Sequence, residues 1–158
     1  RGTSRLGAGR IACRIGAAGP AGVADVFLDT TVCIDLMRER LRKERGPATK
    51  RIAALADAAI YLPVFCLCEL LAGARLSRQP ERERQRVERF AALVDVVYPD
   101  RAFADAYAES EAVLRRRGRP IPTMDLMIGA LVVSRGGSLL TRDSAHFEDI
   151  PDLAVETY

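Results

Sequence analysis

Short apolar runs alternate with longer helical stretches from residue 25 onward, and this alternation constrains the fold more than any other feature. The β-type runs span 26–29, 59–63, 94–99, 138–143 and 153–158. Stretches with helical spacing of apolar residues span 33–44, 48–58, 64–76, 80–93, 100–118 and 121–137. Strands that alternate with helices predict an α/β fold, a three-layer α/β/α sandwich around a mostly parallel sheet of four to five strands.

Local signals add detail to three of the helical stretches. The stretch 100–118 ends in arginines followed by Gly118, as expected for a helix C-terminus with a left-handed cap. Thr123 is the predicted N-cap of the stretch 121–137. The stretch 64–76 carries so few charges that it predicts a largely buried helix, with Cys66 and Cys68 as small core residues.

Length and composition are those of a soluble globular domain. A chain of 158 residues, 49% hydrophobic and 28% charged, supports one domain with one core. No apolar run approaches the roughly 20 residues of a membrane span. Four cysteines make no secreted disulfide framework, so we expect reduced thiols in the cytoplasm. With His146 the only histidine, a zinc site at the cysteines is not expected.

The formal net charge of +3 comes from the first 24 residues. That segment is rich in Gly and Ala and holds four Arg and no acid, whereas 25–158 carries 20 basic and 21 acidic residues. We interpret 1–24 as a flexible tail before a domain over 25–158. The sequence starts without Met, so the tail could be non-native or arise from processing or a misplaced start. RNA binding by the tail is the alternative interpretation.

Four carboxylates stand where a purely structural protein would place other residues. Glu69 and Asp125 are each the only charge within a long apolar stretch, and burying a lone carboxylate is costly unless cations or donors compensate. Asp29 and Asp143 end the first and fourth predicted strands. Because ligands bind beyond the carboxyl ends of parallel strands, near the switch in strand order, we expect these acids to face one crevice.

A cluster of carboxylates favours a divalent cation. Like charges in a partly dry pocket do not all stay ionised without cations, and oxygen ligands alone suit Mg²⁺ or Mn²⁺. Such an ion can activate water and neutralise a phosphate. Each acid taken singly also has a structural interpretation, since Asp29 could cap the following helix and Asp125 could stabilise the dipole of its own.

Four segments carry a resemblance to a known family: LDTTVCIDLMR (28–38), CELLAGAR (68–75), PTMDLMIGAL (122–131) and LLTRDSAHF (139–147). In order and spacing they resemble the four acidic motifs of the PIN-domain ribonucleases, and most of all the VapC-type toxins of bacterial toxin–antitoxin systems. The resemblance covers 25–158. It implies a sandwich whose sheet brings the four acids together, and a Mg²⁺- or Mn²⁺-dependent endoribonuclease that cuts tRNA or rRNA.

The resemblance also implies roles and partners. Asp29, Glu69, Asp125 and Asp143 would be the catalytic residues; the three aspartates would ligate metal, while Glu69 would hold a water. The implied partners are an RNA substrate, a second copy of the chain and a VapB-type antitoxin that inserts a C-terminal segment into the active-site groove. Thr31 departs mildly from the family, which often has Asn or Ser there, and the basic tail has no counterpart.

Polar residues near the acids have open roles. Thr30 or Thr141 could hydrogen-bond a ligating carboxylate, with helix capping or turn formation as equal alternatives. Arg115, Arg116, Arg117 and Arg119 precede the Asp125 segment and could hold RNA phosphates, although a solvated helix end is the slightly favoured interpretation.

Other features have simple structural interpretations. His146 and Phe147 follow the fourth predicted strand, where packing or a loop role is expected. Asp35, inside the first helical stretch, is expected at the surface or as cap support. Arg and Glu alternate at helical spacings over 78–89, which most simply predicts a solvated, ion-paired face, with a dimer or antitoxin contact as the alternative.

Rival functions fit the sequence less well. Phosphotransfer sites on comparable sheets need a late lysine, and the only lysines are Lys43 and Lys50. No phosphate-binding G-x-x-x-x-G-K-[ST] loop exists. The remaining alternative is a catalytically inactive PIN-like module that binds RNA or a protein partner, against which stands the presence of all four acids.

Overall fold

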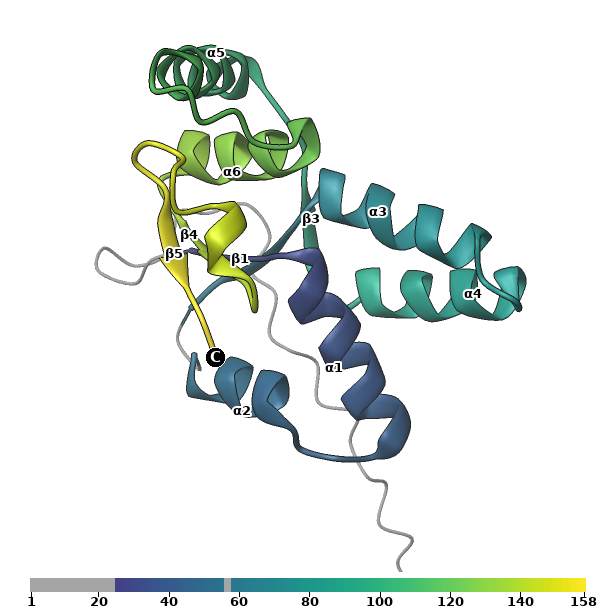
Figure 1. Ribbon diagram of the computed structural model, residues 1–158. Helices are drawn as coiled ribbons and strands as arrows, with labels where there is room; N and C mark the ends of the chain where they lie inside the picture. The colour runs from purple at the N-terminus through teal and green to yellow at the C-terminus, as the bar shows by residue number, and fades with distance from the viewer. Residues whose placement is uncertain (1–24, 56–57) are drawn as a thin grey trace, which may run out of the picture.

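The structure, a computed structural model, describes residues 25–55 and 58–158 (Figure 1). Its strands are β1 (Val26–Leu28), β2 (Ile60–Pro63), β3 (Asp95–Val97), β4 (Ser138–Leu140) and β5 (Ala154–Glu156). Its helices are α1 (Thr30–Arg42), α2 (Pro47–Ala54), α3 (Val64–Arg75), α4 (Pro80–Ala91), α5 (Arg101–Arg116), α6 (Thr123–Arg135) and the short 3₁₀ helix η1 (Ser144–His146). The predicted tail, 1–24, lies outside the described residues.

The sheet is parallel throughout, with strand order β3-β2-β1-β4-β5. Figure 1 shows α5 and α6 on one side of the sheet, α1 and α2 on the other, and the α3–α4 pair projecting beside them. The predicted α/β sandwich is confirmed. The chain moves outward from β1 to β3 and later returns to β4, so the strand order switches between β1 and β4, the place where such sheets form a ligand crevice.

The two central strands are covered on both faces. Every residue of β1 and β4 is buried, as expected for apolar runs in the middle of a parallel sheet. From α6, six residues between Leu126 and Val132 are buried, which explains the nearly charge-free sequence of that helix. The carboxyl ends of β1 and β4 are therefore held by the core itself.

Helix α3 differs from its prediction, because it buries only one stripe. Cys66, Leu70 and Ala74, spaced four residues apart, face the core, while Cys68 is exposed. Helix α4 packs along α3 away from the sheet, so the other sides of α3 meet α4 or solvent. The prediction of Cys68 as a core residue is wrong.

Two predicted boundaries also change. Pro122, and not Thr123, precedes the first helical residue of α6, and its carbonyl accepts from Leu126 N at 3.0 Å. Strand β4 ends at Leu140, three residues earlier than predicted, because the Asp143 N–H turns back to Thr141 Oγ1 at 3.0 Å. Asp143 therefore lies in a turn after the strand. Gly118 has φ 66° just after α5, as its predicted cap role requires.

The charged face of α4 is ion-paired as predicted. Arg84 contacts Glu81 at 3.2 Å and Glu88 at 2.5 Å, and Arg86 contacts Glu83 at 2.7 Å. These exposed pairs at helical spacing contribute little to stability individually. In the described part of the chain, none of the helices has the length and apolar character needed to cross a bilayer.

Glu39 of α1 forms the N-terminal cap of α2. Its carboxylate accepts from Ala48 N at 3.1 Å and Thr49 N at 2.8 Å, while the N-cap residue Gly46 has no side chain to do so. Burial raises the pKa of Glu39, but the hydrogen bonds from Thr49, Ala48 and Gly46 outweigh burial and leave that pKa below its usual value.

We expect Glu39→Gln to destabilise the protein by about 1 kcal/mol at pH 7, the usual cost of weakening a charged cap. Because folding lowers the pKa of Glu39, the stabilisation is present above the unfolded pKa of about 4.3 and is lost as the pH falls through the folded value. Urea unfolding of both proteins at pH 7 and pH 3 measures this. A difference between them that is equally large at both pH values would contradict the prediction.

Candidate active site

Asp29 lies where β1 ends and α1 begins, and it is 5% exposed. Its Oδ2 accepts from the Thr31 hydroxyl at 2.6 Å, from Thr31 N at 3.3 Å and from the Thr141 hydroxyl at 2.8 Å. Leu28 and Leu140 are paired in neighbouring parallel strands, so the next residue of each, Asp29 and Thr141, meet beyond the sheet edge. The carboxylate is thus fixed from two strand ends.

Glu69 enters the same region from α3. The Thr30 hydroxyl, in the first turn of α1, donates to Glu69 Oε2 at 2.5 Å. Both threonines proposed from the sequence, Thr30 and Thr141, therefore hydrogen-bond a carboxylate of the predicted set. The Thr31 hydroxyl also donates to a carboxylate of this set, that of Asp29. The sequence marks Thr31 as a departure from the family but does not predict this contact.

Asp125 and Asp143 lie on either side of His146. His146 Nδ1 is 3.3 Å from Asp125 Oδ2, and Nε2 is 3.6 Å from Asp143 Oδ2. Phe147 is 3% exposed and packs in the core, as expected, whereas the imidazole of His146 contacts two acids of the site. The sequence held a sign of the contact between His146 and Asp143, because the two residues are only three positions apart. It held none of the contact with Asp125.

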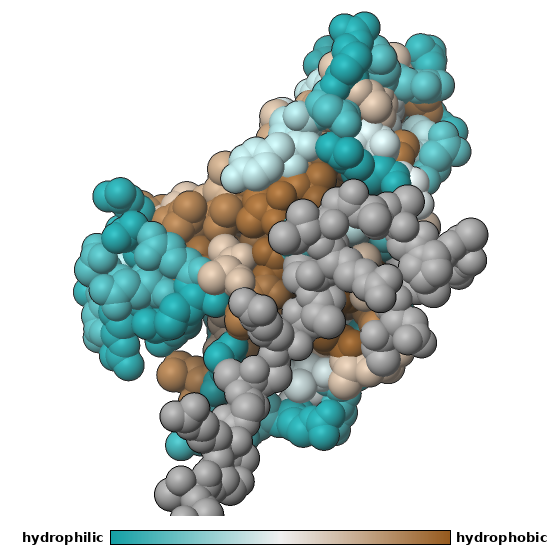
Figure 2. Space-filling model, turned by 180° about the vertical axis from the view of Figure 1, so that it is seen from behind, coloured by the Kyte–Doolittle hydropathy of each residue, from teal (hydrophilic) through white to brown (hydrophobic). Residues whose placement is uncertain are grey.

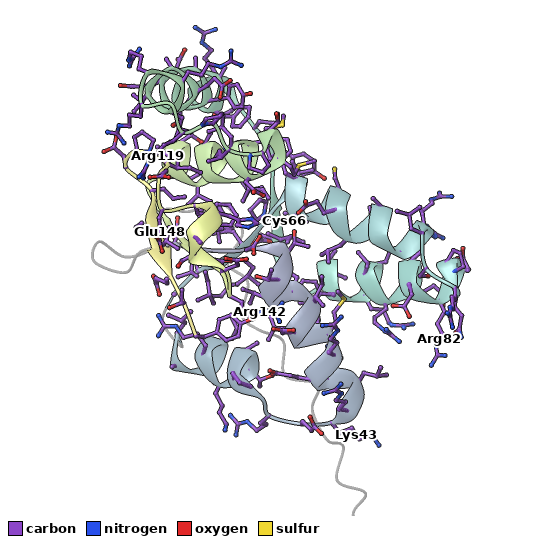
Figure 3. The ribbon with its side chains drawn as sticks, in the orientation of Figure 1. Lys43, Cys66, Arg82, Arg119, Arg142 and Glu148 are labelled. Carbon is purple, nitrogen blue, oxygen red and sulfur yellow. The ribbon has the colours of Figure 1, made fainter. Side chains whose placement is uncertain are left out.

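Three of the acids lie close enough for their charges to interact, and Asp29 and Glu69 both act on a thiol nearby. Burial raises the pKa of Asp125; His146 opposes this rise, while the charges of Asp29 and Asp143 add to it. Burial raises the pKa of the Cys66 thiol, and Asp29 and Glu69 raise it further. Figure 3 labels Cys66 near the middle of the molecule.

Arg115 and Arg119 are paired elsewhere. Arg115 Nε contacts Glu111 at 2.7 Å on α5, and Arg119 Nη1 contacts Asp149 at 2.6 Å. Both side chains are largely exposed. Within the described ranges, the contacts of these arginines do not include any of the four acids.

The donor chemistry of the site suits a hard divalent cation, because the four acids offer only oxygens and repel one another. As the side chains lie, however, no group of three or more His, Cys, Asp or Glu among the described residues is arranged to hold a metal ion. Threonine hydroxyls bind Asp29 and Glu69, and His146 lies between the other two. The donor set therefore fits Mg²⁺ or Mn²⁺, and ligation requires the side chains to turn toward the ion.

The PIN domain family matches residues 26–153 of the chain. This chain belongs to the PIN-domain family. Among curated relatives, the tRNA(fMet)-specific endonuclease VapC of Shigella flexneri is 32% identical over 132 residues, 84% of this chain and 96% of the relative. Ribonuclease VapC1 of Haemophilus influenzae (strain R2866) is 29% identical over 80% of this chain and 92% of its own length.

Solved structures agree with this assignment. DNA-bound VapBC from Salmonella typhimurium matches with a TM-score of 0.73 and 28% identity, covering 85% of this chain and 98% of that one. VapBC2 from Rickettsia felis bound to a promoter DNA fragment matches with a TM-score of 0.75 at 20% identity, covering 84% and 98%. The PIN-like sandwich predicted from the motifs, and the resemblance to VapC proteins, are confirmed.

Proposed function

We propose that this PIN-domain protein is a divalent-metal-dependent endoribonuclease and the toxin of a toxin–antitoxin pair. The observation that supports the proposal is that Asp29 and Asp143 lie close enough to raise the pKa of Asp125 near the switch point of the sheet, while Glu69 accepts a hydrogen bond from Thr30, the residue after Asp29. The VapC relatives support the reaction class.

The roles we propose for the four acids are those that the resemblance to PIN-domain ribonucleases implies. Asp29, Asp125 and Asp143 would hold the ion, Mg²⁺ or Mn²⁺, and Glu69 would orient the attacking water. When bound, the ion supplies positive charge against the phosphate and acidifies water. Thr31 and Thr141 hold Asp29 Oδ2, and Thr30 holds Glu69 Oε2, which restricts the directions from which these carboxylates can act.

Cleavage of purified RNA tests this function directly. We expect the purified chain to cut a tRNA pool in Mg²⁺ or Mn²⁺, and to stop when EDTA removes the ion. A tRNA pool is the first substrate to try, because one relative is named as a tRNA-specific endonuclease. Activity that persists in EDTA would contradict metal dependence. RNA binding without cleavage in any tested Mg²⁺ or Mn²⁺ concentration would instead favour the inactive binding module.

The structural neighbours are VapBC complexes, which supports a VapB-type antitoxin as partner. A groove of about 290 Å³ leads away from the site and is lined by residues of α1, α3 and α4, including Thr30, Met37, Glu69 and Arg86. We propose that an antitoxin segment lies in this groove and covers Glu69. Co-expression with the antitoxin encoded beside this chain should suppress both growth arrest and RNA cleavage.

We also propose that the chain forms a homodimer and acts in the cytoplasm, where its RNA substrate is found. Figure 2 shows hydrophobic residues gathered in one area of the reverse face, with hydrophilic residues on either side. Exposed apolar area of this kind favours contact with another protein chain. Sedimentation equilibrium on the purified chain would distinguish a dimer from a monomer.

A further inference from the structure

Arg142 lies between two residues of the site, Thr141 and Asp143. Its backbone N–H donates to Thr31 Oγ1 at 3.2 Å, the hydroxyl that also donates to Asp29. Its side chain turns to α1, where Nη1 donates to Asp35 Oδ2 at 2.8 Å. Figure 3 labels Arg142 beside α1. A cation is thus held through both backbone and side chain, one residue before Asp143 and one hydrogen bond away from the Thr31 hydroxyl that contacts Asp29.

Asp35 holds this cation from a half-buried position. The Asp35 side chain is 19% exposed and accepts from the Tyr158 hydroxyl at 3.0 Å as well as from Arg142. Burial raises the pKa of Tyr158, and its hydrogen bond to Asp35 raises it further, so the phenol remains a donor at neutral pH. Asp35, predicted to lie at the surface or to support a cap, instead joins α1, the loop after β4 and the C-terminal residue.

The Arg142 guanidinium is well placed to bind a phosphate. Its side chain is 54% exposed, and the contact with Asp35 uses one of the five N–H donors that a guanidinium carries. Arginine matches phosphate oxygens with two parallel N–H groups, and a side chain already held in place loses little freedom on binding. RNA that enters an acidic site also needs cations near its flanking phosphates, because the acids repel them.

We propose that Arg142 binds a phosphate of the RNA backbone adjacent to the bond that is cut, and that Asp35 and Tyr158 are positioning residues for it. The proposal rests on the proposed ribonuclease function and deepens it by assigning a substrate-binding residue. A purely structural latch, in which the three side chains only tie the C-terminus to α1, is the competing explanation, and it makes a different prediction for the variants.

The test measures RNA binding apart from cleavage. Each substitution is placed in an Asp29→Asn background with Mg²⁺ present, and binding of a fluorescent single-stranded RNA is followed by anisotropy from 50 to 300 mM KCl. We expect Arg142→Gln to weaken binding about tenfold and to reduce the slope of log K against log salt by about 0.7, the value for one lost phosphate contact on a single strand. Arg142→Lys should keep the slope.

Two controls separate the explanations. Tyr158→Phe removes a hydrogen bond of the cluster but no cation, and Arg101→Gln removes an exposed, ion-paired arginine at the start of α5. Arg101→Gln should leave affinity and slope unchanged, whereas Tyr158→Phe should weaken binding less than Arg142→Gln does and should keep the slope, because the cation remains. In the protein with Asp29 intact, Arg142→Gln should raise KM with little change in kcat. Where Arg142→Gln fails to fold, Arg142→Met, which keeps the aliphatic stem, replaces it.

The outcomes distinguish this proposal from the function on which it rests. An unchanged salt slope in Arg142→Gln, while the background protein binds RNA, overturns the role of Arg142 alone. Equal losses in Tyr158→Phe and Arg142→Gln also overturn it and establish the structural latch. A chain with Asp29 intact that neither binds nor cuts RNA overturns both proposals.

Discussion

Asp29→Asn should lower the rate of RNA cleavage about a thousandfold or more, equivalent to roughly 4 kcal/mol of barrier, because it removes a charged oxygen donor proposed to hold the ion. Asp29 is the acid most firmly held in the structure, since its Oδ2 accepts from Thr31 and Thr141. An amide can keep these hydrogen bonds through its oxygen, but it carries no charge for a cation. The loss of cleavage should therefore come from the missing negative charge and not from a change in the hydrogen bonds around residue 29.

The fold should survive this substitution. Asp29 caps α1 by accepting from Thr31 N, and Asn is as good an N-cap as Asp. Thermal unfolding of both proteins checks stability, single-turnover cleavage of tRNA measures the rate, and induction in a growing culture measures growth arrest. The matched control is Asp105→Asn, an exposed acid on α5, which should cleave normally. Normal cleavage by Asp29→Asn would contradict the assignment of this residue.

Phe27→Ala should destabilise the protein by about 3–5 kcal/mol, since it removes a large aromatic side chain from a packed core. Phe27 is 1% exposed in the central strand β1, and its ring centroid is 5.2 Å from that of Tyr61 on β2. A Cβ on Gly137 would come within 2.5 Å of the ring, so Phe27 fills the space against the start of β4 as well. Its removal leaves a cavity between three strands.

Differential scanning calorimetry measures this effect, with an expected fall in Tm of about 10 °C for a chain of this size. Because small domains are stable by only about 5–15 kcal/mol, this loss is a large share of the total free energy of unfolding. The control is Leu76→Ala, a residue that is 89% exposed and should change stability by less than about 0.5 kcal/mol. A small effect at Phe27 would mean that the core collapses around the gap.

The order of strands and helices could be predicted from the sequence because each element carries its own periodicity. The apolar run at β1, the charged stripe of α4 and the cap at Gly118 are local features, and the structure places elements there. The end of β4 could not be predicted, because it depends on a turn in which the Asp143 N–H meets the Thr141 hydroxyl. Periodicity also cannot tell which side of α3 faces α4. For this reason Cys68 was predicted to lie in the core, whereas the structure leaves it exposed.

The residues of the candidate site also fall into those that could be predicted from the sequence and those that could not. Isolated carboxylates in apolar surroundings are visible in a sequence, since the cost of burial makes them unusual, and Glu69 and Asp125 could be singled out on that ground. Asp29 and Asp143 could be singled out because they end predicted strands. Thr30 and Thr141 could be proposed as partners of these acids, but the contacts between distant segments could not. His146 meets Asp125, and Arg142 meets Asp35 across 107 residues of the chain, and no local pattern predicts either contact.

The sequence alone therefore determined the fold class and the acids of the site, because periodicity and the desolvation cost of charge are properties of short segments. The tertiary structure decided how those acids are held. The pairing of β1 with β4 places Thr141 against Asp29, and the packing of α6 near η1 sets His146 between Asp125 and Asp143. Hydrogen bonds of this kind depend on distances between segments, which are settled only when the core packs.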